Sequence, residues 1–380
     1  MYKFLIDENI PYALDAFSKL GSVELISGRE INNKSLQSTD ILIVRSITKV
    51  NEELLDGTPV KFVGTTTIGS DHIDIQYLQK NNIGFANAPG CNADSVAEYV
   101  FVALLTFASG AGFRLGDKSI GIIGYGSIGS RIAKIASGFG MTTLINDPPL
   151  QRKTGESFFI TYNEALQADI ITYHVPLNLT GVDKTYHMLS EGQLKSFDNK
   201  KIILNSSRGG VVSNEDLKNY FNWQKSTAIL DVWENEPFID IELLNLVQTG
   251  TPHIAGYSSE GKVNGTVMIF NSLCKFLMVN KEWKPNLPLI EKVVIEYPET
   301  DTPEESINII ISEIYDISSD DMNLRKISGL TGKDIGKYFD QLRKNYPARR
   351  EFPNYTVRIN KKLQREIGIL KALRFNIKIY

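Results

Sequence analysis

The stretch SIGIIGYGSIG, residues 119–129, decides the fold. It places Gly124, Gly126 and Gly129 in the spacing G-x-G-x-x-G directly after an apolar run. Glycines at this spacing allow a tight turn, a close backbone approach to a pyrophosphate, and close packing of the next helix on the strand. The pattern indicates a dinucleotide site when a strand precedes it, a helix follows, and an acid lies about 20 residues further on. All three conditions are met. The apolar run precedes the glycines, a helix-forming segment follows them, and Asp147 ends the next apolar run.

The glycine loop therefore predicts that the chain binds NAD. Asp147 favours NAD over NADP, because its carboxylate can accept a hydrogen bond from the ribose 2′-hydroxyl and would repel a 2′-phosphate. Ser127 and Ile128, inside the loop, are expected to contact the cofactor together with the three glycines. The alternatives are a glycine-rich turn of an ordinary α/β unit, and an acid that merely follows a strand.

Short apolar runs alternate with helix-forming segments on both sides of this loop. Such alternation predicts parallel sheets with helices on both faces, and hence a doubly wound α/β fold. The runs lie at 3–7, 41–45, 61–65 and 84–87 before the loop, and at 142–147, 169–176, 201–207, 227–233 and 249–256 after it.

Composition limits the function classes. A chain of 380 residues with 42% hydrophobic and 22% charged residues fits two or three globular domains. The net charge of −3 argues against a globally basic nucleic-acid binder. The chain shows no signal-peptide pattern, and its longest apolar stretch, 96–113, contains Glu98. We expect a cytoplasmic protein without a nucleic-acid, membrane or metal site.

A nicotinamide enzyme that oxidises an alcohol needs a proton acceptor and often a cation for an acidic substrate. His253 follows an apolar run, and histidine titrates near neutrality, as a general base should. Asp231, Glu234 and Glu236 could orient its ring, and Arg208 could grip a carboxylate with two hydrogen bonds. Taken singly, each of these residues fits a structural role about equally well.

The order of these motifs resembles the D-2-hydroxyacid dehydrogenase family. After the glycine loop come HVPL (174–177), NSSRGGVV (205–212), DVWENEP (231–237) and PHIAG (252–256). The resemblance implies two Rossmann-like lobes with the active site in a cleft between them. The NAD-binding lobe would span 94–257, and the catalytic lobe would combine 1–93 with 258–286.

The same resemblance implies roles for individual residues. His253 would take the hydroxyl proton as a hydride leaves for the nicotinamide, and Glu236 would orient and charge the imidazole. Arg208 would hold the substrate carboxylate and the developing carbonyl oxygen. Further contacts to the cofactor would come from Val175, Asp231 and Gly256.

Three more segments narrow the resemblance within the family, namely 5–21, 43–55 and 252–266. They are similar to members that oxidise, at C2, a four-carbon 2-hydroxy acid with a terminal phosphate, in vitamin B6 biosynthesis. The resemblance makes Ser46, Thr67 and Tyr257 substrate contacts. That Arg45 binds the phosphate is a separate hypothesis. The alternative is that Arg45 is an ordinary surface arginine. Two alternatives remain: a sister enzyme for another acid such as 3-phosphoglycerate, and a non-catalytic NAD-sensing interaction protein.

The last block, 287–380, resembles the C-terminal dimerisation domain of those members, so we expect a small α/β domain and a homodimer. Its apolar stripe is formed by Ile307, Ile310, Ile311 and Ile314, with Ile309 beside it. A basic run contains Arg343, Lys344, Arg349 and Arg350. We interpret this run as a solvated face, with the alternative that it reaches the partner's cleft and binds the substrate phosphate.

Overall fold

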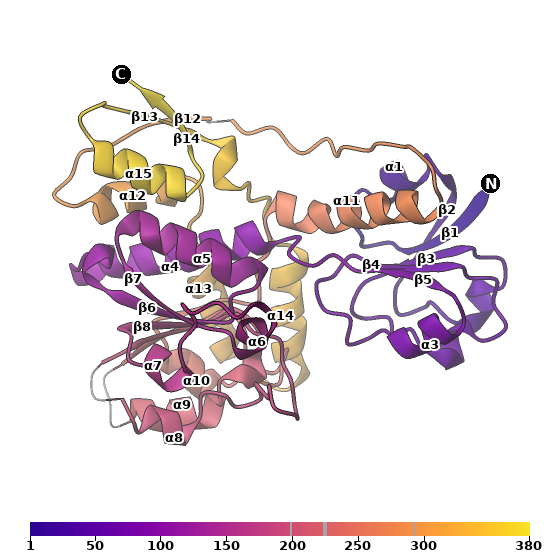
Figure 1. The fold of residues 1–380 in the computed structure, drawn as a ribbon, viewed down its shortest axis with the longest axis horizontal. Helices are drawn as coiled ribbons and strands as arrows, with labels where there is room; N and C mark the ends of the chain where they lie inside the picture. The colour runs from indigo at the N-terminus through magenta and orange to yellow at the C-terminus, as the bar shows by residue number, and fades with distance from the viewer. Residues whose placement is uncertain (198–199, 223–225, 292) are drawn as a thin grey trace. The chain divides into compact units, whose positions relative to one another are not determined.

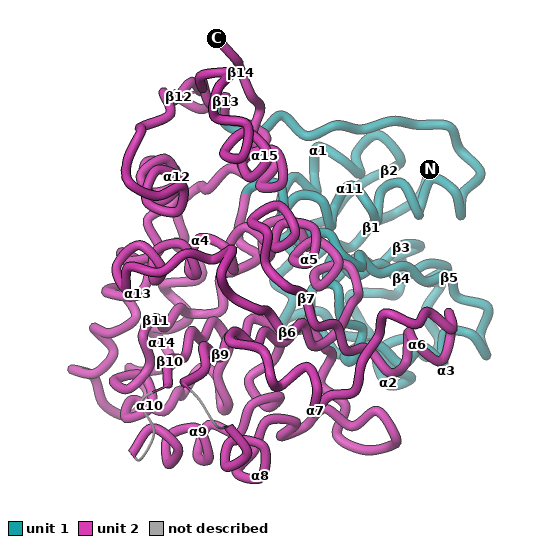
Figure 2. Tube along the Cα trace, turned by 60° about the vertical axis from the view of Figure 1, so that its left-hand side comes forward, with its two compact units in different colours: residues 1–92, 259–289 teal, residues 93–258, 290–380 magenta. Residues whose placement is uncertain are grey.

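The computed structural model describes residues 1–197, 200–222, 226–291 and 293–380 (Figure 1). The chain separates into two compact units (Figure 2). Unit 1 combines 1–92 with 259–289, and unit 2 combines 93–258 with 290–380. The C-terminal block thus belongs to the same unit as the glycine loop.

Unit 1 is built on a five-stranded parallel sheet in the order β2-β1-β3-β4-β5. Its strands are β1 (Tyr2–Asp7), β2 (Gly21–Ile26), β3 (Ile41–Val44), β4 (Phe62–Thr65) and β5 (Gly84–Ala86). Its α-helices are α1 (Ala13–Phe17), α2 (Glu52–Leu55), α3 (Ile75–Lys80) and α11 (Ser259–Phe276), and η1 (Asn33–Leu36) is a 3₁₀ turn.

Alternate residues of the unit 1 strands point to opposite faces of the sheet, and each face has its own core. Phe4 and Ile43 pack with Phe270 of α11 on one face. Leu5 and Leu42 belong to the core of the other face. A parallel sheet buried on both faces needs continuous apolar strands, which explains why β3 reads ILIV.

Unit 2 contains a six-stranded parallel sheet in the order β11-β10-β9-β8-β6-β7. Its strands are β6 (Ser119–Ile123), β7 (Thr142–Asn146), β8 (Ile170–Tyr173), β9 (Ile202–Asn205), β10 (Thr227–Leu230) and β11 (Thr249–Gly250). The strand order reverses between β6 and β8, which is where doubly wound sheets bind their ligands.

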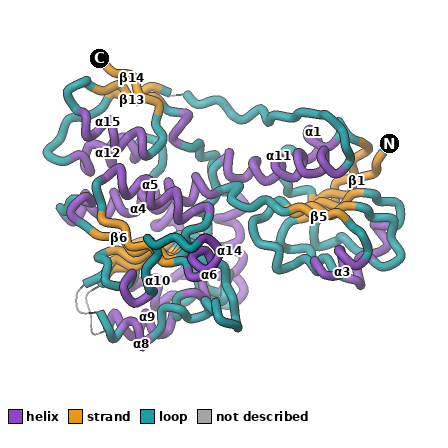
Figure 3. The backbone as a smooth tube through the Cα atoms, viewed as in Figure 1, coloured by secondary structure: helices purple, strands orange, loops and turns teal. Residues whose placement is uncertain are grey.

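Helices cover both faces of this sheet (Figure 3). They are α4 (Ala93–Ala111), α5 (Ser127–Phe139), α6 (Pro148–Thr154), α7 (Tyr162–Ala165), α8 (Glu191–Leu194), α9 (Asn214–Phe221) and α10 (Ile241–Leu246), with 3₁₀ turns η2 (Leu115–Asp117) and η3 (Gly209–Val211). By length and composition alone, α4 could cross a membrane, but 72% of its apolar window is buried inside the structure. Phe101 of α4 stacks on Phe139 of α5, as in a core helix.

The C-terminal block forms a three-stranded parallel sheet in the order β12-β13-β14 and a set of helices. Its elements are β12 (Val294–Glu296), α12 (Pro303–Ser312), α13 (Ile317–Arg325), η4 (Lys326–Gly329), α14 (Lys333–Lys344), η5 (Phe352–Asn354), β13 (Thr356–Ile359), α15 (Gln364–Ala372) and β14 (Asn376–Ile379). Ile307, Ile310 and Ile311 of α12 lie in the same core as α4 and α5. Asp321 of α13 accepts a hydrogen bond from the backbone of Gly250, so this block also covers the edge strand β11.

The predicted α/β class with parallel sheets is confirmed. Two local predictions differ from the structure. The apolar run at 249–256 contributes only the two-residue strand β11, because His253 has a left-handed φ of 58° that ends the extended backbone. The basic run is not a solvated face throughout, because Arg349 is buried. The three-domain division stays a prediction.

Candidate active site

The predicted cofactor and catalytic residues of unit 2 follow successive strands at one edge of the sheet. Carboxyl ends of parallel strands meet at the same edge, so side chains that follow them converge. Gly124 follows β6, Asp147 follows β7, Val175 lies two residues beyond β8, Arg208 three beyond β9, Asp231 follows β10, and His253 lies three beyond β11. Residues scattered over 130 positions are thereby collected at one edge.

The glycine loop has the backbone that a dinucleotide site requires. Gly124 has φ 94°, and a Cβ there would lie 2.5 Å from the carbonyl oxygen of His174. A Cβ on Gly129 would lie 1.9 Å from the carbonyl oxygen of Gly124, so α5 packs directly on the end of β6. Beside Gly126 there is open space within 4 Å.

The N-terminus of α5 is suited to a phosphate. Gly126 is its N-cap residue and offers no side-chain hydrogen bond to the first turn. Gly126 and Ser127 are exposed, and Ile128 is partly buried. Backbone amides at the start of a helix carry partial positive charge and bind anions. These residues fit a bound pyrophosphate.

Asp147 joins the glycine loop to the end of β7. Its Oδ2 atom accepts a hydrogen bond from the backbone amide of Tyr125 at 2.8 Å, and its Oδ1 atom caps α6 through the amide of Leu150 at 2.9 Å. Each carboxylate oxygen has two acceptor sites, so the side chain keeps capacity for a ribose hydroxyl. The contact with the ribose stays a prediction.

His253 and Glu236 form a hydrogen-bonded pair. The Nδ1 atom of His253 lies 2.7 Å from Oε2 of Glu236, and Oε1 of Glu236 accepts a bond from the amide of Trp233 at 2.9 Å. Burial alone would raise the pKa of Glu236, but the hydrogen bond and charge of His253 bring that pKa below its usual range. An ionised Glu236 accepts from Nδ1–H, which leaves Nε2 of the ring as the atom that can take a proton.

Asp231 anchors the loop that carries His253. Its carbonyl oxygen accepts from the amide of His253 at 2.8 Å. Its carboxylate accepts from the amides of Ile254 and Ala255 and from the hydroxyl of Thr251. Burial raises the pKa of Asp231, and these bonds together with His253 counteract that rise. They also hold His253 in its left-handed conformation, which costs a side chain about 1–3 kcal/mol.

Asp231→Asn is expected to destabilise the fold by about 2 kcal/mol or more. The NH₂ group of the asparagine side chain would face backbone N–H groups, and two donors cannot form a hydrogen bond. The turnover number should fall as well, since the His253 loop loses its anchor. Thermal unfolding and steady-state kinetics would measure both effects. Asp334→Asn, at an exposed position of α14, is the matched control and should change the free energy of unfolding by less than about 0.5 kcal/mol. Equal stability of the two variants would contradict the anchor role.

Arg208, Val175 and Gly256 lie in the loops of this edge. Arg208 is exposed, and its guanidinium donates to the carbonyl oxygen of Ser207 at 2.8 Å. Asn205, the last residue of β9, donates to the carbonyl oxygen of Arg208 at 2.9 Å and so fixes its backbone. Val175 and Gly256 are partly buried. The roles of these three side chains stay predictions.

The other histidines have partners of their own. The Nε2 atom of His187 lies 2.6 Å from Oε1 of Glu234, so Glu234 and Glu236 each hold a different histidine. His174 bonds to Thr172 at 2.7 Å, and burial lowers its pKa to about 3. In unit 1, the Nε2 atom of His72 lies 3.0 Å from the hydroxyl of Thr65, and burial lowers the pKa of His72. These partners leave His253 as the candidate base.

The predicted substrate residues of unit 1 lie at the carboxyl edge of its own sheet. Arg45 and Ser46 follow β3, and Thr67 follows the neighbouring strand β4. Arg45 donates from Nε to the buried Asp7 at 2.9 Å, so its charge is already paired. The hydroxyl of Thr67 donates to the carbonyl oxygen of Gly69 at 2.8 Å. Ser46 is exposed.

Tyr257, the remaining predicted substrate contact, packs against the C-terminal block. Its ring lies edge-on to Tyr346 with centroids 5.8 Å apart, and the guanidinium carbon of Arg343 lies 5.7 Å from its centroid. Arg349 donates to Ala255 at 2.8 Å and to Ser95 at 2.6 Å, and thereby ties the same loop to α4. Sequence reasoning missed this support, and its one signal was the basic run that holds both arginines.

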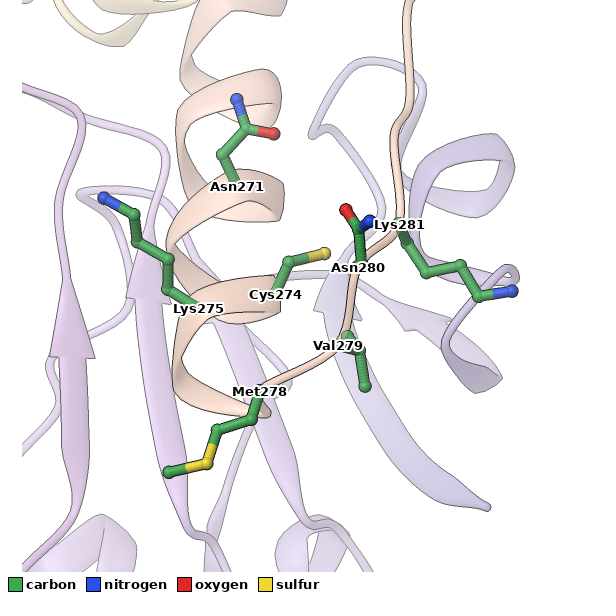
Figure 4. Close-up of a pocket in the computed structure, with 7 residues that line it drawn as sticks. All are labelled: Asn271, Cys274, Lys275, Met278, Val279, Asn280 and Lys281. Atoms are coloured by element: carbon green, nitrogen blue, oxygen red, sulfur yellow. The ribbon is translucent and has the colours of Figure 1, made fainter.

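Two pockets of the structure each lie within one unit. One of about 400 Å³ is lined by Asn271, Cys274, Lys275, Met278, Val279, Asn280 and Lys281 near the end of α11 (Figure 4). It contains none of the predicted site residues. The other, of about 230 Å³, lies beside the His253 loop and is lined by Pro252 and by residues of α13, α14 and the chain after α14. Within the described ranges, no group of three His, Cys, Asp or Glu side chains could hold a metal ion.

Comparison with known families agrees with this geometry. Residues 106–255 match the family described as "D-isomer specific 2-hydroxyacid dehydrogenase, NAD binding domain". Residues 289–371 match a second family, described as "Domain of unknown function (DUF3410)".

Curated relatives match almost the full chain. The erythronate-4-phosphate dehydrogenase of Proteus mirabilis is 42% identical over 380 residues, which cover 98% of this chain and 99% of the relative. The enzyme of the same name from Escherichia coli O7:K1 is 44% identical over 361 residues, or 93% of each chain.

Solved structures share the fold at lower identity. D-lactate dehydrogenase from Aquifex aeolicus, solved with NAD and lactic acid, is 24% identical with a TM-score of 0.58 and covers 73% of this chain and 95% of its own. NAD⁺-bound 3-phosphoglycerate dehydrogenase from Entamoeba histolytica is also 24% identical, with a TM-score of 0.61 and the same two coverages.

Proposed function

Because the chain belongs to the erythronate-4-phosphate dehydrogenase family, we propose that it oxidises 4-phospho-D-erythronate at C2 with NAD. The product is (R)-3-hydroxy-2-oxo-4-phosphooxybutanoate, in the biosynthesis of pyridoxal 5′-phosphate. The observation that carries the catalytic part is the 2.7 Å pair of His253 and Glu236 beside a glycine loop of dinucleotide-binding geometry.

Bound NAD supplies the hydride acceptor. Residues of the chain transfer the proton and stabilise the charges that develop. Nε2 of His253 takes the proton of the C2 hydroxyl while the C2–H bond gives up its electron pair, and the C–O bond becomes a carbonyl. Glu236 holds the ring through Nδ1 and stabilises the imidazolium that forms. Arg208 grips the carboxylate and the developing carbonyl oxygen.

Cofactor and substrate are assigned to two sets of residues. The cofactor residues are Gly124, Gly126, Ser127, Ile128, Gly129, Asp147, Val175, Asp231 and Gly256. The open space beside Gly126 supports the pyrophosphate position. The substrate residues are Arg45, Ser46, Thr67 and Tyr257. Their positions after parallel strands and beside the His253 loop support the assignment.

The test is NADH formation by purified protein with 4-phospho-D-erythronate, D-3-phosphoglycerate and unphosphorylated erythronate as parallel substrates. An added 2-oxo acid guards against slow NADH release, and NADP replaces NAD in one arm. Selective turnover of 4-phospho-D-erythronate with NAD supports the proposal. Selective turnover of phosphoglycerate would identify a sister enzyme. NAD binding without any turnover would favour the NAD-sensing alternative.

Arg45→Ala is expected to raise KM for 4-phospho-D-erythronate by about tenfold, because one cationic group near the substrate is lost. The pair with Asp7 orients Arg45 through Nε, and its terminal nitrogens stay available to a phosphate. Lys49→Ala, at an exposed position in the same loop, is the control. An unchanged KM in Arg45→Ala would exclude Arg45 as a phosphate ligand.

We also propose a cytoplasmic homodimer formed through 287–380. Exposed apolar side chains on this block support the proposal, with Ile309 of α12 at 41% and Val294 of β12 at 47% exposure. Light scattering after gel filtration should give twice the 42.6 kDa of one chain at micromolar concentration. A single species of monomer mass would contradict it.

A further inference from the structure

The helix α14 brings a cation to the catalytic loops of its own unit. Near its start, Gly336 packs on the residues that follow Glu236: a Cβ there would lie 3.1 Å from Pro237 and 3.0 Å from Phe238. At its end, the guanidinium of Arg343 lies 5.7 Å from the centroid of the Tyr257 ring. One helix therefore spans from the base-orienting loop to a predicted substrate contact.

The charge of Arg343 has no carboxylate partner within 4 Å among the described residues. Its Nε atom is buried and has no hydrogen-bond partner there. Other arginines of the block are paired, such as Arg325 with Asp321 and Arg374 with Glu351. A half-buried guanidinium without a carboxylate at salt-bridge distance is costly to keep unless an anion joins it.

The proposed substrate carries two anionic groups, and its carboxylate is assigned to Arg208. The phosphate then needs a second cation in addition to Arg45. Arg45 is paired with the buried Asp7, so that pair is neutral overall. Arg343 adds a full positive charge next to Tyr257. A guanidinium matches the geometry of phosphate oxygens and can donate two hydrogen bonds to them.

We propose that Arg343 is a specificity-determining residue that binds the terminal phosphate of the substrate bound by the same chain. The inference rests on the proposed function and deepens it, because it assigns the phosphate group of that substrate. Tyr257 provides the ring surface against which the guanidinium is held. Arg343 also lowers the pKa of Glu236, so a second role through Glu236 and His253 has to be separated by experiment.

The experiment compares Arg343→Met and Arg343→Lys with wild type in the full-length enzyme. Lys344→Met is the matched control, because Lys344 is the next residue of α14 and is exposed. For 4-phospho-D-erythronate, kcat/KM should fall about 10- to 100-fold in Arg343→Met, mainly through KM, with partial recovery in Arg343→Lys. For unphosphorylated erythronate, kcat/KM should stay unchanged. Thermal unfolding confirms that each variant is folded.

Two outcomes would overturn the inference. Equal losses for both substrates, with a shifted pH profile, would mean that Arg343 acts through Glu236 and His253. No loss for either substrate would remove Arg343 from the site. Binding of inorganic phosphate, measured by calorimetry, gives a readout without turnover, and Arg343→Met should weaken it. If wild type binds phosphate through Arg343 but does not oxidise 4-phospho-D-erythronate, the proposed function fails while the anion site stands.

Discussion

His253→Gln is expected to lower kcat by about 1,000-fold while leaving the dissociation constant of NAD unchanged. The variant keeps a side chain of similar reach but loses the ring nitrogen proposed to take the hydroxyl proton. General base catalysis contributes about 10²- to 10⁴-fold to such reactions. Steady-state kinetics with 4-phospho-D-erythronate and a fluorescence titration with NAD would measure the two quantities.

His187→Gln is the matched control. His187 bonds to Glu234 at 2.6 Å through Nε2, and His253 bonds to Glu236 at 2.7 Å through Nδ1. If histidine–glutamate pairs served only the fold, the two variants would behave alike. We expect kcat of His187→Gln to stay within a factor of about three, since an exchange away from the reacting atoms leaves the proton transfer intact. A similar loss in both variants would remove His253 from its role as the base.

The pH dependence of the Glu236–His253 pair follows from the direction in which the pKa of Glu236 is shifted. The pKa of Glu236 is below its usual range, so its carboxylate is ionised throughout the neutral region. Its contribution to stability is present above the pKa of the unfolded chain and is lost only as the pH falls through the lower folded value. Loss of the Glu236 charge should therefore reduce kcat/KM only on the acidic side of neutrality. Glu236→Gln should lower kcat at neutral pH, because the imidazolium that forms during turnover loses its carboxylate partner.

Where local rules fix geometry, the sequence predicted which residues lie at the same edge of the sheet. The residues after β6, β7, β9 and β10 could be placed together because parallel strands end at one edge and each strand is a short apolar run. The pairing of Glu236 with His253 depends on tertiary structure, and from the residues alone Glu234 and Asp231 were equally available. Here the family resemblance identified the carboxylate that the structure brings to 2.7 Å from His253.

Other features could not be predicted. Arg343 and Tyr257 are 86 positions apart, and no periodicity in a basic run shows which arginine turns inward. Arg349 is buried because Ser95 and Ala255 accept its hydrogen bonds. The sequence also did not predict that β11 has only two residues, because the apolar pattern continues through Ile254 while the backbone turns at His253.

Gly129→Ala is expected to have the largest effect on the cofactor site. Its Cβ would lie 1.9 Å from the carbonyl oxygen of Gly124, which is backbone and cannot rotate away. Relief requires that α5 move off the end of β6, at a cost of about 3 kcal/mol in the free energy of unfolding. The same movement would displace the helix N-terminus, so the dissociation constant of NAD should rise about 100-fold. Thermal unfolding and NAD titration measure these effects.

Gly126→Ala separates packing from cofactor contact within the same loop. Gly126 has φ −72° and open space around its Cβ position, so alanine fits the fold and should leave the free energy of unfolding within about 0.5 kcal/mol. If the pyrophosphate approaches the backbone there, the added methyl group should raise the dissociation constant of NAD about tenfold. Unchanged NAD affinity would place the pyrophosphate away from Gly126. A stable Gly129→Ala protein that binds NAD normally would show that close contact between α5 and β6 is not needed.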